Sequence, residues 1–135
     1  MAGATFGLIH ERSAHFVFGE FSSKFAQAAL QAPHLGDPLV TESAPGTVPI
    51  IEQADVDFNI DTYCLTHNET STGASMQLSR PAIPADALVV VDGTSAAGGI
   101  AWSPTEVDVY YFSPQKGFAS EGGTWIALCS PRAVE

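Results

Sequence analysis

The stretch Ala87-Leu88-Val89-Val90-Val91-Asp92 decides the fold of this chain, because a continuous apolar run ends in a single carboxylate. A strand that is apolar at every position has both of its faces buried, and this pattern is typical of the centre of a parallel sheet. The run is also far too short to span a bilayer, which takes about 20 apolar residues in a helix. We therefore predict a central parallel strand at residues 87–91.

Further short apolar runs lie on both sides of this strand and alternate with helical or loop segments. A helix is predicted from Ser22 to Gln31, ended by Pro33, because apolar residues recur there at spacings of three and four. Strand–helix alternation with continuous apolar runs predicts an α/β fold. The other predicted strands are residues 15–18, 38–41, 63–65, 107–112 and 124–128, and the apolar stripe of the helix is Phe21, Phe25, Ala28 and Ala29.

The composition excludes some classes of partner. The 135 residues suffice for one domain or part of one, and 15 acidic against 5 basic residues give a net charge of −10. That sign argues against binding nucleic acid or docking on an anionic membrane surface. Charged residues make up only 15% of the chain, below the usual value of roughly 25%. We infer that another part of a protein covers some of this surface.

The first residues and the cysteines point to a reducing compartment. No basic segment with a long apolar core follows Met1, so we expect no secretory signal and a cytoplasmic location. Cys64 and Cys129 both lie in apolar runs, which predicts two reduced, buried thiols.

Most motifs that would name a chemistry are missing from the sequence. We find no glycine-rich nucleotide fingerprint, no Walker loop, no Gly-x-Ser-x-Gly elbow and no His-Glu-x-x-His, and the cysteines lack metal-ligand spacing, so we expect no metal site. A run from Asp55 to Asn59 resembles the start of a calcium loop, but Ile60 and Thr66 replace the Gly and Glu that such a loop needs. A strand edge fits this run better, through the alternating residues Val56, Phe58 and Ile60.

Polar side chains follow three consecutive predicted strands, at residues 67–70, 92–95 and 113–116. In parallel α/β sheets, ligands bind at the carboxyl ends of the strands. The sequence therefore predicts one shared site built from these three strand ends.

Three residues at these strand ends suit pyridoxal phosphate, which needs a lysine for its aldehyde and a carboxylate for its ring nitrogen. Lys116, one of two lysines, has mostly apolar or small neighbours, and a desolvated amine is available for Schiff-base chemistry. Asp92 is the candidate carboxylate and Thr70 a candidate hydroxyl. Each has a structural alternative: Asp92 as a turn former or helix cap, and Thr70 and Asn68 as cap or turn residues.

Three longer stretches, in this order and spacing, resemble the phosphoserine aminotransferases of actinobacteria, and residues 19–25 resemble the Gly-x-Phe turn of the same group. The resemblance implies a fold-type I pyridoxal-phosphate enzyme, whose large domain has a mostly parallel central sheet flanked by helices. The stretches are His67-Asn68-Glu69-Thr70-Ser71-Thr72-Gly73, residues 91–99 (Val-Asp-Gly-Thr-Ser-Ala-Ala-Gly-Gly) and residues 111–125 (Tyr-Phe-Ser-Pro-Gln-Lys-Gly-Phe-Ala-Ser-Glu-Gly-Gly-Thr-Trp).

The resemblance also implies a role for each matching residue. Lys116 would bind the cofactor aldehyde and later move a proton at the substrate, and Asp92 would pair with the ring nitrogen. Thr70 would contact the cofactor near its phenolic oxygen, with Asn68 a weaker candidate, and Gln115 would contact its phosphate. The implied reaction moves an amino group between L-glutamate and 3-phosphohydroxypyruvate, giving O-phospho-L-serine and 2-oxoglutarate in serine biosynthesis, in a homodimeric enzyme.

Residues 1–135 match only the middle of the family's large domain, without its N-terminal segment and the C-terminal small domain. We therefore expect the isolated chain not to be catalytically competent. Two alternatives stay open at this point. The first is another fold-type I enzyme, such as an alanine–glyoxylate-type aminotransferase or a cysteine desulfurase. The second is a non-catalytic truncated product that binds a partner chain through uncovered apolar faces.

Overall fold

The computed structural model describes residues 1–51 and 57–135. Asp55 and Val56, which belong to the calcium-loop and strand-edge patterns, lie outside these residues. The strand-edge interpretation is wrong for Phe58, which is exposed in a turn that the Ile60 amide closes onto the Asp57 carbonyl at 3.0 Å.

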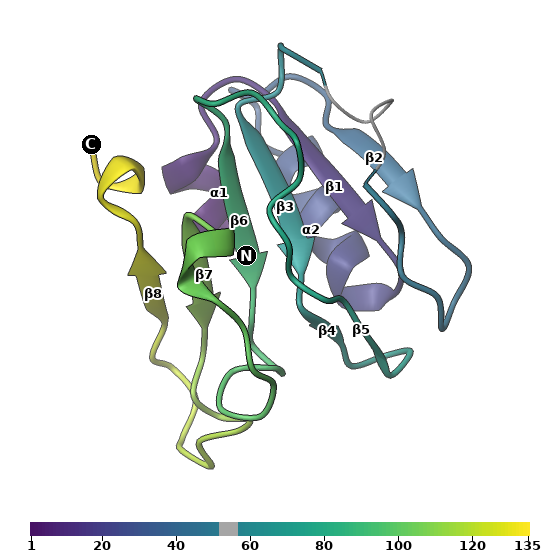
Figure 1. The fold of residues 1–135 in the computed structure, drawn as a ribbon, viewed down its shortest axis with the longest axis vertical. Coiled ribbons are helices and arrows are strands. Elements are labelled where there is room, and N and C mark those ends of the chain that lie inside the picture. The colour runs from purple at the N-terminus through teal and green to yellow at the C-terminus, as the bar shows by residue number, and fades with distance from the viewer. Residues whose placement is uncertain (52–56) are drawn as a thin grey trace.

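A six-stranded, mostly parallel sheet forms the centre of the molecule, as predicted (Figure 1). All neighbouring strands run parallel except the last pair, β7 and β8, which is antiparallel. The α/β fold class is therefore confirmed. In spatial order the strands are β2 (Leu39–Glu42), β1 (Ser13–Val17), β3 (Thr62–Thr66), β6 (Leu88–Asp92), β7 (Val109–Phe112) and β8 (Ile126–Cys129).

Strand β6 lies at the centre of this sheet, and its apolar run is buried on both faces as predicted. Val89 and Val91 contribute to one hydrophobic core and Val90 to the other. The register places Asp92, the last residue of β6, beside Thr66 of β3 and Tyr111 of β7. The ends of these three strands are therefore level, which positions the residues that follow them.

Both α-helices, α1 (Ala2–Leu8) and α2 (Glu20–Leu30), pack on the same face of the sheet (Figure 1). Coil residues and a short 3-10 helix, η2 (Pro104–Glu106), lie over the opposite face, where Met76, Ile83 and Trp102 join the core. Helix α1 was not predicted, because its sequence Ala-Gly-Ala-Thr-Phe-Gly-Leu contains two helix-weakening glycines and no N-terminal cap.

Helix α2 is confirmed, but its buried stripe differs from the prediction. Phe25 and Ala29 are buried as expected, whereas Phe21 is 36% exposed. Ser22 takes the inward position instead, because its amide and hydroxyl both donate to the Glu69 carboxylate at 2.8 Å. A polar contact therefore sets the rotation of the first helical turn, and no apolar pattern could indicate it.

The remaining elements lie at the two ends of the sheet. A small antiparallel hairpin follows β3, formed by β4 (Asn68–Glu69) and β5 (Ala74–Ser75). The 3-10 helix η3 (Pro131–Ala133) follows β8. Among the residues that the structure describes, no helix has the length and apolar character needed to cross a membrane.

The prediction that both cysteines are buried is half wrong. Cys64 is a buried free thiol, but Cys129 is a free thiol that is exposed. Cys129 ends β8, the outer strand of the sheet, and most of the side chains of that strand are open to solvent. An apolar run alone does not distinguish an edge strand from a central one, which explains the error.

Candidate functional site

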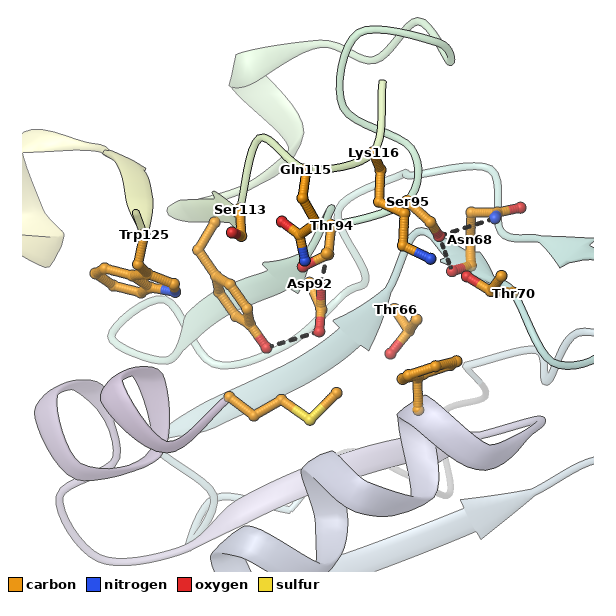
Figure 2. A pocket seen from close by; sticks show the side chains of 13 residues that line it. Thr66, Asn68, Thr70, Asp92, Thr94, Ser95, Ser113, Gln115, Lys116 and Trp125 are labelled. Atoms are coloured by element: carbon orange, nitrogen blue, oxygen red, sulfur yellow. Dashed lines mark hydrogen bonds between the residues drawn. The ribbon is translucent and has the colours of Figure 1, made fainter. Parts of the chain in front are cut away.

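A cavity of about 260 Å³ opens at the carboxyl ends of β3, β6 and β7 (Figure 2). The three polar strand ends predicted to share one site all contribute to it, together with Met1, one residue of α2 and the residue that directly precedes β8. Its lining residues are Met1, Phe21, Thr66, Asn68, Thr70, Asp92, Thr94, Ser95, Tyr111, Ser113, Gln115, Lys116 and Trp125.

Asp92 is the buried carboxylate of this cavity, only 6% exposed. Its Oδ1 accepts the Thr94 amide at 2.9 Å and its Oδ2 accepts the Tyr111 hydroxyl at 3.1 Å. The bond from the Thr94 amide closes a turn, so the turn-forming alternative is correct for Oδ1 of Asp92. The same residue also lines the cavity. The two donors hold the carboxylate in one orientation.

Tyr111 keeps its proton and remains a donor to Asp92. Burial raises the pKa of the Tyr111 hydroxyl well above its usual value, and the negative charge of Asp92 raises it further. The ring of Phe25 in α2 packs edge-on against the Tyr111 ring with the ring centroids 5.9 Å apart, and the Trp125 ring centroid lies 5.7 Å from that of Tyr111. The donor is therefore fixed by aromatic packing as well as by its hydrogen bond.

Lys116 follows β7 in a turn and reaches toward the strand ends from above (Figure 2). Its side chain is exposed, so the prediction of a desolvated lysine is wrong for this chain. The error arises because the flanking residues 115–120 are themselves exposed and do not cover the amine. Within residues 1–51 and 57–135 no carboxylate forms an ion pair with Lys116, whereas Lys24 pairs with Glu20 at 2.7 Å.

Close backbone packing holds the Lys116 turn against the loop that follows β6. A Cβ atom placed on Gly117 would lie 2.3 Å from the Ala97 carbonyl oxygen, so only glycine fits here without a shift of the backbone. This contact brings the segment carrying Gln115 and Lys116 over the end of β6.

The β4–β5 hairpin, which follows β3, brings Asn68 and Thr70 to the cavity. The Asn68 side-chain amide donates to the Ser95 hydroxyl at 2.9 Å, and that hydroxyl donates to the Asn68 carbonyl at 2.9 Å. This pair of bonds joins the hairpin to the loop after β6, so Thr70 and Asp92 belong to one connected polar wall. Asn68 lies in β4 and not in a cap or turn, so the structural alternative is wrong for Asn68, whereas Thr70 does lie in the turn that follows β4.

Sequence reasoning missed several lining residues. Thr66 was missed although it ends β3, directly before the predicted polar residues 67–70; Ser95 and Ser113 lie within the predicted strand ends, but no individual role was assigned to them. Tyr111 reaches the cavity from inside β7, which only the face alternation of a strand could have indicated. Nothing local marks Phe21 and Trp125, because tertiary packing alone brings them to the cavity.

The donor set of this cavity fits pyridoxal phosphate. It offers the Lys116 amine, the oriented Asp92 carboxylate, several hydroxyls, and aromatic side chains at its edge. An aldehyde, a ring nitrogen and an apolar ring each find a matching group among these residues. Among the described residues, no cluster of three or more His, Cys, Asp or Glu side chains could hold a metal ion.

Comparison with known sequences gives relatives over almost the whole chain. Phosphoserine aminotransferase of Nocardioides sp. is 55% identical over 134 residues, which cover 98% of this chain and 35% of the relative. Phosphoserine aminotransferase of Rhodococcus opacus is 50% identical over 132 residues, with the same coverage of both chains. The chain thus spans about a third of the length of the curated relatives it matches. No family model matches the chain.

Comparison with solved structures gives the same kind of protein. A phosphoserine aminotransferase from Cytophaga hutchinsonii superposes with a TM-score of 0.83 at 28% identity, over 98% of this chain and 37% of that one. An alanine–glyoxylate aminotransferase from Nostoc sp. gives 0.82 at 20% identity, over 99% and 38%. A pyridoxal-phosphate-bound phosphoserine aminotransferase from Trichomonas vaginalis gives 0.71 at 16% identity, over 98% and 40%. The last two likenesses concern the fold alone.

Proposed function

Because this chain is homologous over nearly its whole length to about a third of the phosphoserine aminotransferase chain, we propose that residues 1–135 are the central part of the cofactor-binding large domain of such an enzyme. The observation that supports this most is the cavity, which a lysine, a carboxylate and a threonine from three successive strand ends line together.

The proposed reaction is amino transfer between L-glutamate and 3-phosphohydroxypyruvate, giving O-phospho-L-serine and 2-oxoglutarate in serine biosynthesis. Bound pyridoxal phosphate supplies an aldehyde for amines and a ring that withdraws electrons from the substrate carbon. The task of this chain is then to hold that group, to orient it, and to move one proton.

Lys116 is the residue that we assign to covalent attachment and to proton transfer at the substrate's Cα. It is the one lysine that lines the cavity, and the absence of an ion pair among the described residues leaves its amine available. Lys24, the other lysine, is held by Glu20 on the outer surface of α2. The chain therefore offers a matched control for every experiment on Lys116.

Asp92 is assigned to the ring nitrogen, since a carboxylate beside that nitrogen keeps it protonated and keeps the ring electron-withdrawing. Its orientation by Thr94 and Tyr111 means that no reorganisation is needed when charge develops. Thr70, with Asn68 as the weaker candidate, is assigned to the phenolic oxygen, and Gln115 to the phosphate.

A chimera tests this proposal. In it, this chain replaces the matching third of the Nocardioides relative, and the transfer from O-phospho-L-serine to 2-oxoglutarate is measured. We expect activity in the chimera, a loss of at least about 10³-fold in its Lys116→Ala variant, since the nucleophile is then missing, and little change in its Lys24→Ala variant. An unaffected rate in Lys116→Ala would overturn the assignment.

The same chimera separates the alternatives. A preference for alanine and glyoxylate over the phosphorylated substrates would favour an alanine–glyoxylate-type enzyme, whose likeness to this chain concerns the fold alone at 20% identity. An inactive chimera with a normal melting temperature would favour a non-catalytic product. Relatives that are 47–55% identical and named phosphoserine aminotransferase support the first assignment.

We further propose that the working enzyme is a homodimer in the cytoplasm, that it acts on small molecules, and that the isolated chain is not competent. Catalysis depends on groups placed around the substrate, and positioning together with electrostatic stabilisation supplies most of a rate enhancement. The cavity described here supplies the lysine and carboxylate, but no arginine lines it for a substrate carboxylate or phosphate among the described residues.

A further inference from the structure

Glu69 is a fully buried carboxylate that does not line the cavity but lies directly behind its wall. It is 0% exposed and accepts five hydrogen bonds. Oε1 accepts the Phe21 amide at 3.2 Å, the Ser71 amide at 3.3 Å and the Ser71 hydroxyl at 2.8 Å. Oε2 accepts the Ser22 amide and the Ser22 hydroxyl, both at 2.8 Å.

The surrounding sequence is shaped to admit this carboxylate. A Cβ atom on Gly19, just before α2, would lie 2.3 Å from Cγ of Glu69, so glycine leaves the space that the side chain fills. The Glu20 amide donates to the Ser71 hydroxyl at 2.9 Å, which extends the same network along the first turn. The amides of three successive residues, Glu20, Phe21 and Ser22, therefore all donate to Ser71 or Glu69.

The network keeps Glu69 ionised. Burial alone would raise its pKa, but hydrogen bonds from Ser22, Ser71 and Phe21 outweigh this and lower the pKa below its usual value. A carboxylate can only accept, and each of its partners here is a donor, so the charged form matches the site. The start of a helix also favours a negative charge.

A single oxygen of Glu69 connects two walls of the cavity. Oε1 bonds Phe21, which forms part of the α2 wall, and Ser71, which directly follows Thr70 on the hairpin wall. Asn68 and Thr70, the neighbours of Glu69 in the chain, both line the cavity, and Asn68 is tied onward to Ser95. The carboxylate is therefore hydrogen-bonded to both walls at once.

We infer that Glu69 is a positioning residue of the cofactor site. It sets the distance between Phe21 and Thr70, and this distance determines how well a phosphorylated aromatic ligand fits. This inference rests on the proposed function of the cavity. The competing interpretation is that Glu69 only caps α2, in which case it would affect ligand binding no more than any other change that weakens this helix.

Two variants separate these interpretations. Glu69→Gln keeps the size of the side chain but replaces one accepting oxygen with a donor, so part of the link to Phe21, Ser22 or Ser71 is lost. Ala26→Gly weakens α2 at a buried position that does not line the cavity. For wild type and both variants we would measure the melting temperature, the dissociation constant for pyridoxal phosphate by fluorescence titration, and amide hydrogen exchange.

We expect Glu69→Gln to weaken cofactor binding about tenfold, because misplacement of contact groups by about 1 Å is costly, while Ala26→Gly leaves it nearly unchanged at a similar melting temperature. Amide exchange at Ser71 should accelerate in Glu69→Gln and not in Ala26→Gly. Equal losses of affinity in both variants, or unchanged exchange at Ser71, would overturn the inference. If wild type does not bind the cofactor, the proposed function fails and this inference fails with it; if wild type binds and both variants lose affinity equally, the inference alone is overturned.

Discussion

Asp92 takes its orientation from two donors, and one of them, the Tyr111 hydroxyl, can be removed without changing the packing of the ring. In Tyr111→Phe the carboxylate keeps the Thr94 amide but loses its bond at Oδ2. We expect about 1–3 kcal/mol of stability to be lost, because a buried carboxylate oxygen is left unpaired, together with weaker binding of pyridoxal phosphate. Chemical unfolding and a fluorescence titration measure the two effects.

Tyr110→Phe is the matched control for this change. Tyr110 precedes Tyr111 in β7 and its hydroxyl pairs with His67 Nδ1 at 2.9 Å, on the other face of the sheet. Its removal is expected to lower stability and to leave cofactor affinity unaltered. Equal losses of affinity in the two variants would contradict the assignment of Tyr111 to the site.

Gly117 is a second position where the gain or loss of one side-chain atom is expected to change cofactor binding. In Gly117→Ala the new Cβ meets the Ala97 carbonyl, so the turn carrying Lys116 must move away from the end of β6. We expect borohydride trapping of pyridoxal phosphate on Lys116 to fall several-fold, by the same positional argument as for contact groups generally. Gly122→Ala, where nothing lies within 4 Å of the added atom, should trap like wild type. A normal yield in Gly117→Ala would show that this packing does not position the lysine.

At the residue scale, the sequence could predict which side chains gather at the cavity but not how each is surrounded. Asp92 was predictable because it ends the most apolar strand. The exposure of Lys116 was not, since apolar or small neighbours in sequence gave no protection from solvent in the fold. The roles assigned to Lys116, Asp92, Thr70 and Gln115 stay predictions until they are tested.

At the scale of elements, the contact between β4 and the start of α2 should make stability depend on pH. The pKa of Glu69 is lower in the folded chain than its ordinary value of 4.5. A group of this kind contributes stability that is fully present above its unfolded pKa and is lost as the pH falls through the folded pKa. We therefore expect the stability advantage of wild type over Glu69→Gln to shrink as the pH is lowered from 7 toward 3.

Urea unfolding at a series of pH values measures this difference. Burial raises the pKa of Asp108, but hydrogen bonds from Arg132, Val89 and Arg80 outweigh this and lower it. Asp108 therefore also loses stabilising free energy as the pH falls, but it does so equally in both proteins and cancels in the comparison. A gap between wild type and Glu69→Gln that stays constant from pH 7 to pH 3 would mean that the charge of Glu69 does not stabilise the contact.

Element prediction succeeded where one apolar pattern dominated and failed where tertiary contacts decided. β6, β7 and α2 follow directly from continuous or periodic apolar residues. Helix α1 and the β4–β5 hairpin have no such pattern. Packing against α2 and the sheet holds α1, and side-chain bonds to a neighbouring loop hold the hairpin. The outward exposure of β8 depends on its place at the sheet edge, which no local pattern records.

At the scale of the molecule, the low content of charged residues is matched by apolar side chains that remain open to solvent. Leu128 is 51% exposed and Trp125 is 49% exposed, both around the outer strand β8. An unpaired edge with apolar side chains favours association. We expect the isolated chain to associate in a concentration-dependent way, as sedimentation velocity would measure.

Leu128→Lys is expected to reduce this association, although it changes the net charge from −10 to −9 and so slightly weakens the repulsion between copies. Ile50→Lys makes the same change of charge at an exposed apolar residue outside β8, and should leave association unaltered. Identical behaviour of the two variants, or a strictly monomeric wild type, would contradict a role for this edge.

The central claim is that Lys116 is the amine that reacts with pyridoxal phosphate, and reductive trapping tests it most directly. The purified chain is incubated with the cofactor, reduced with borohydride, and digested for peptide mass spectrometry. The alternatives are few: Lys24, paired with Glu20 on the surface, and the Met1 amino group, whose pKa is lowered by burial. The account predicts label predominantly on Lys116. Equal labelling of Lys116 and Lys24, label on Met1 alone, or no label would contradict it.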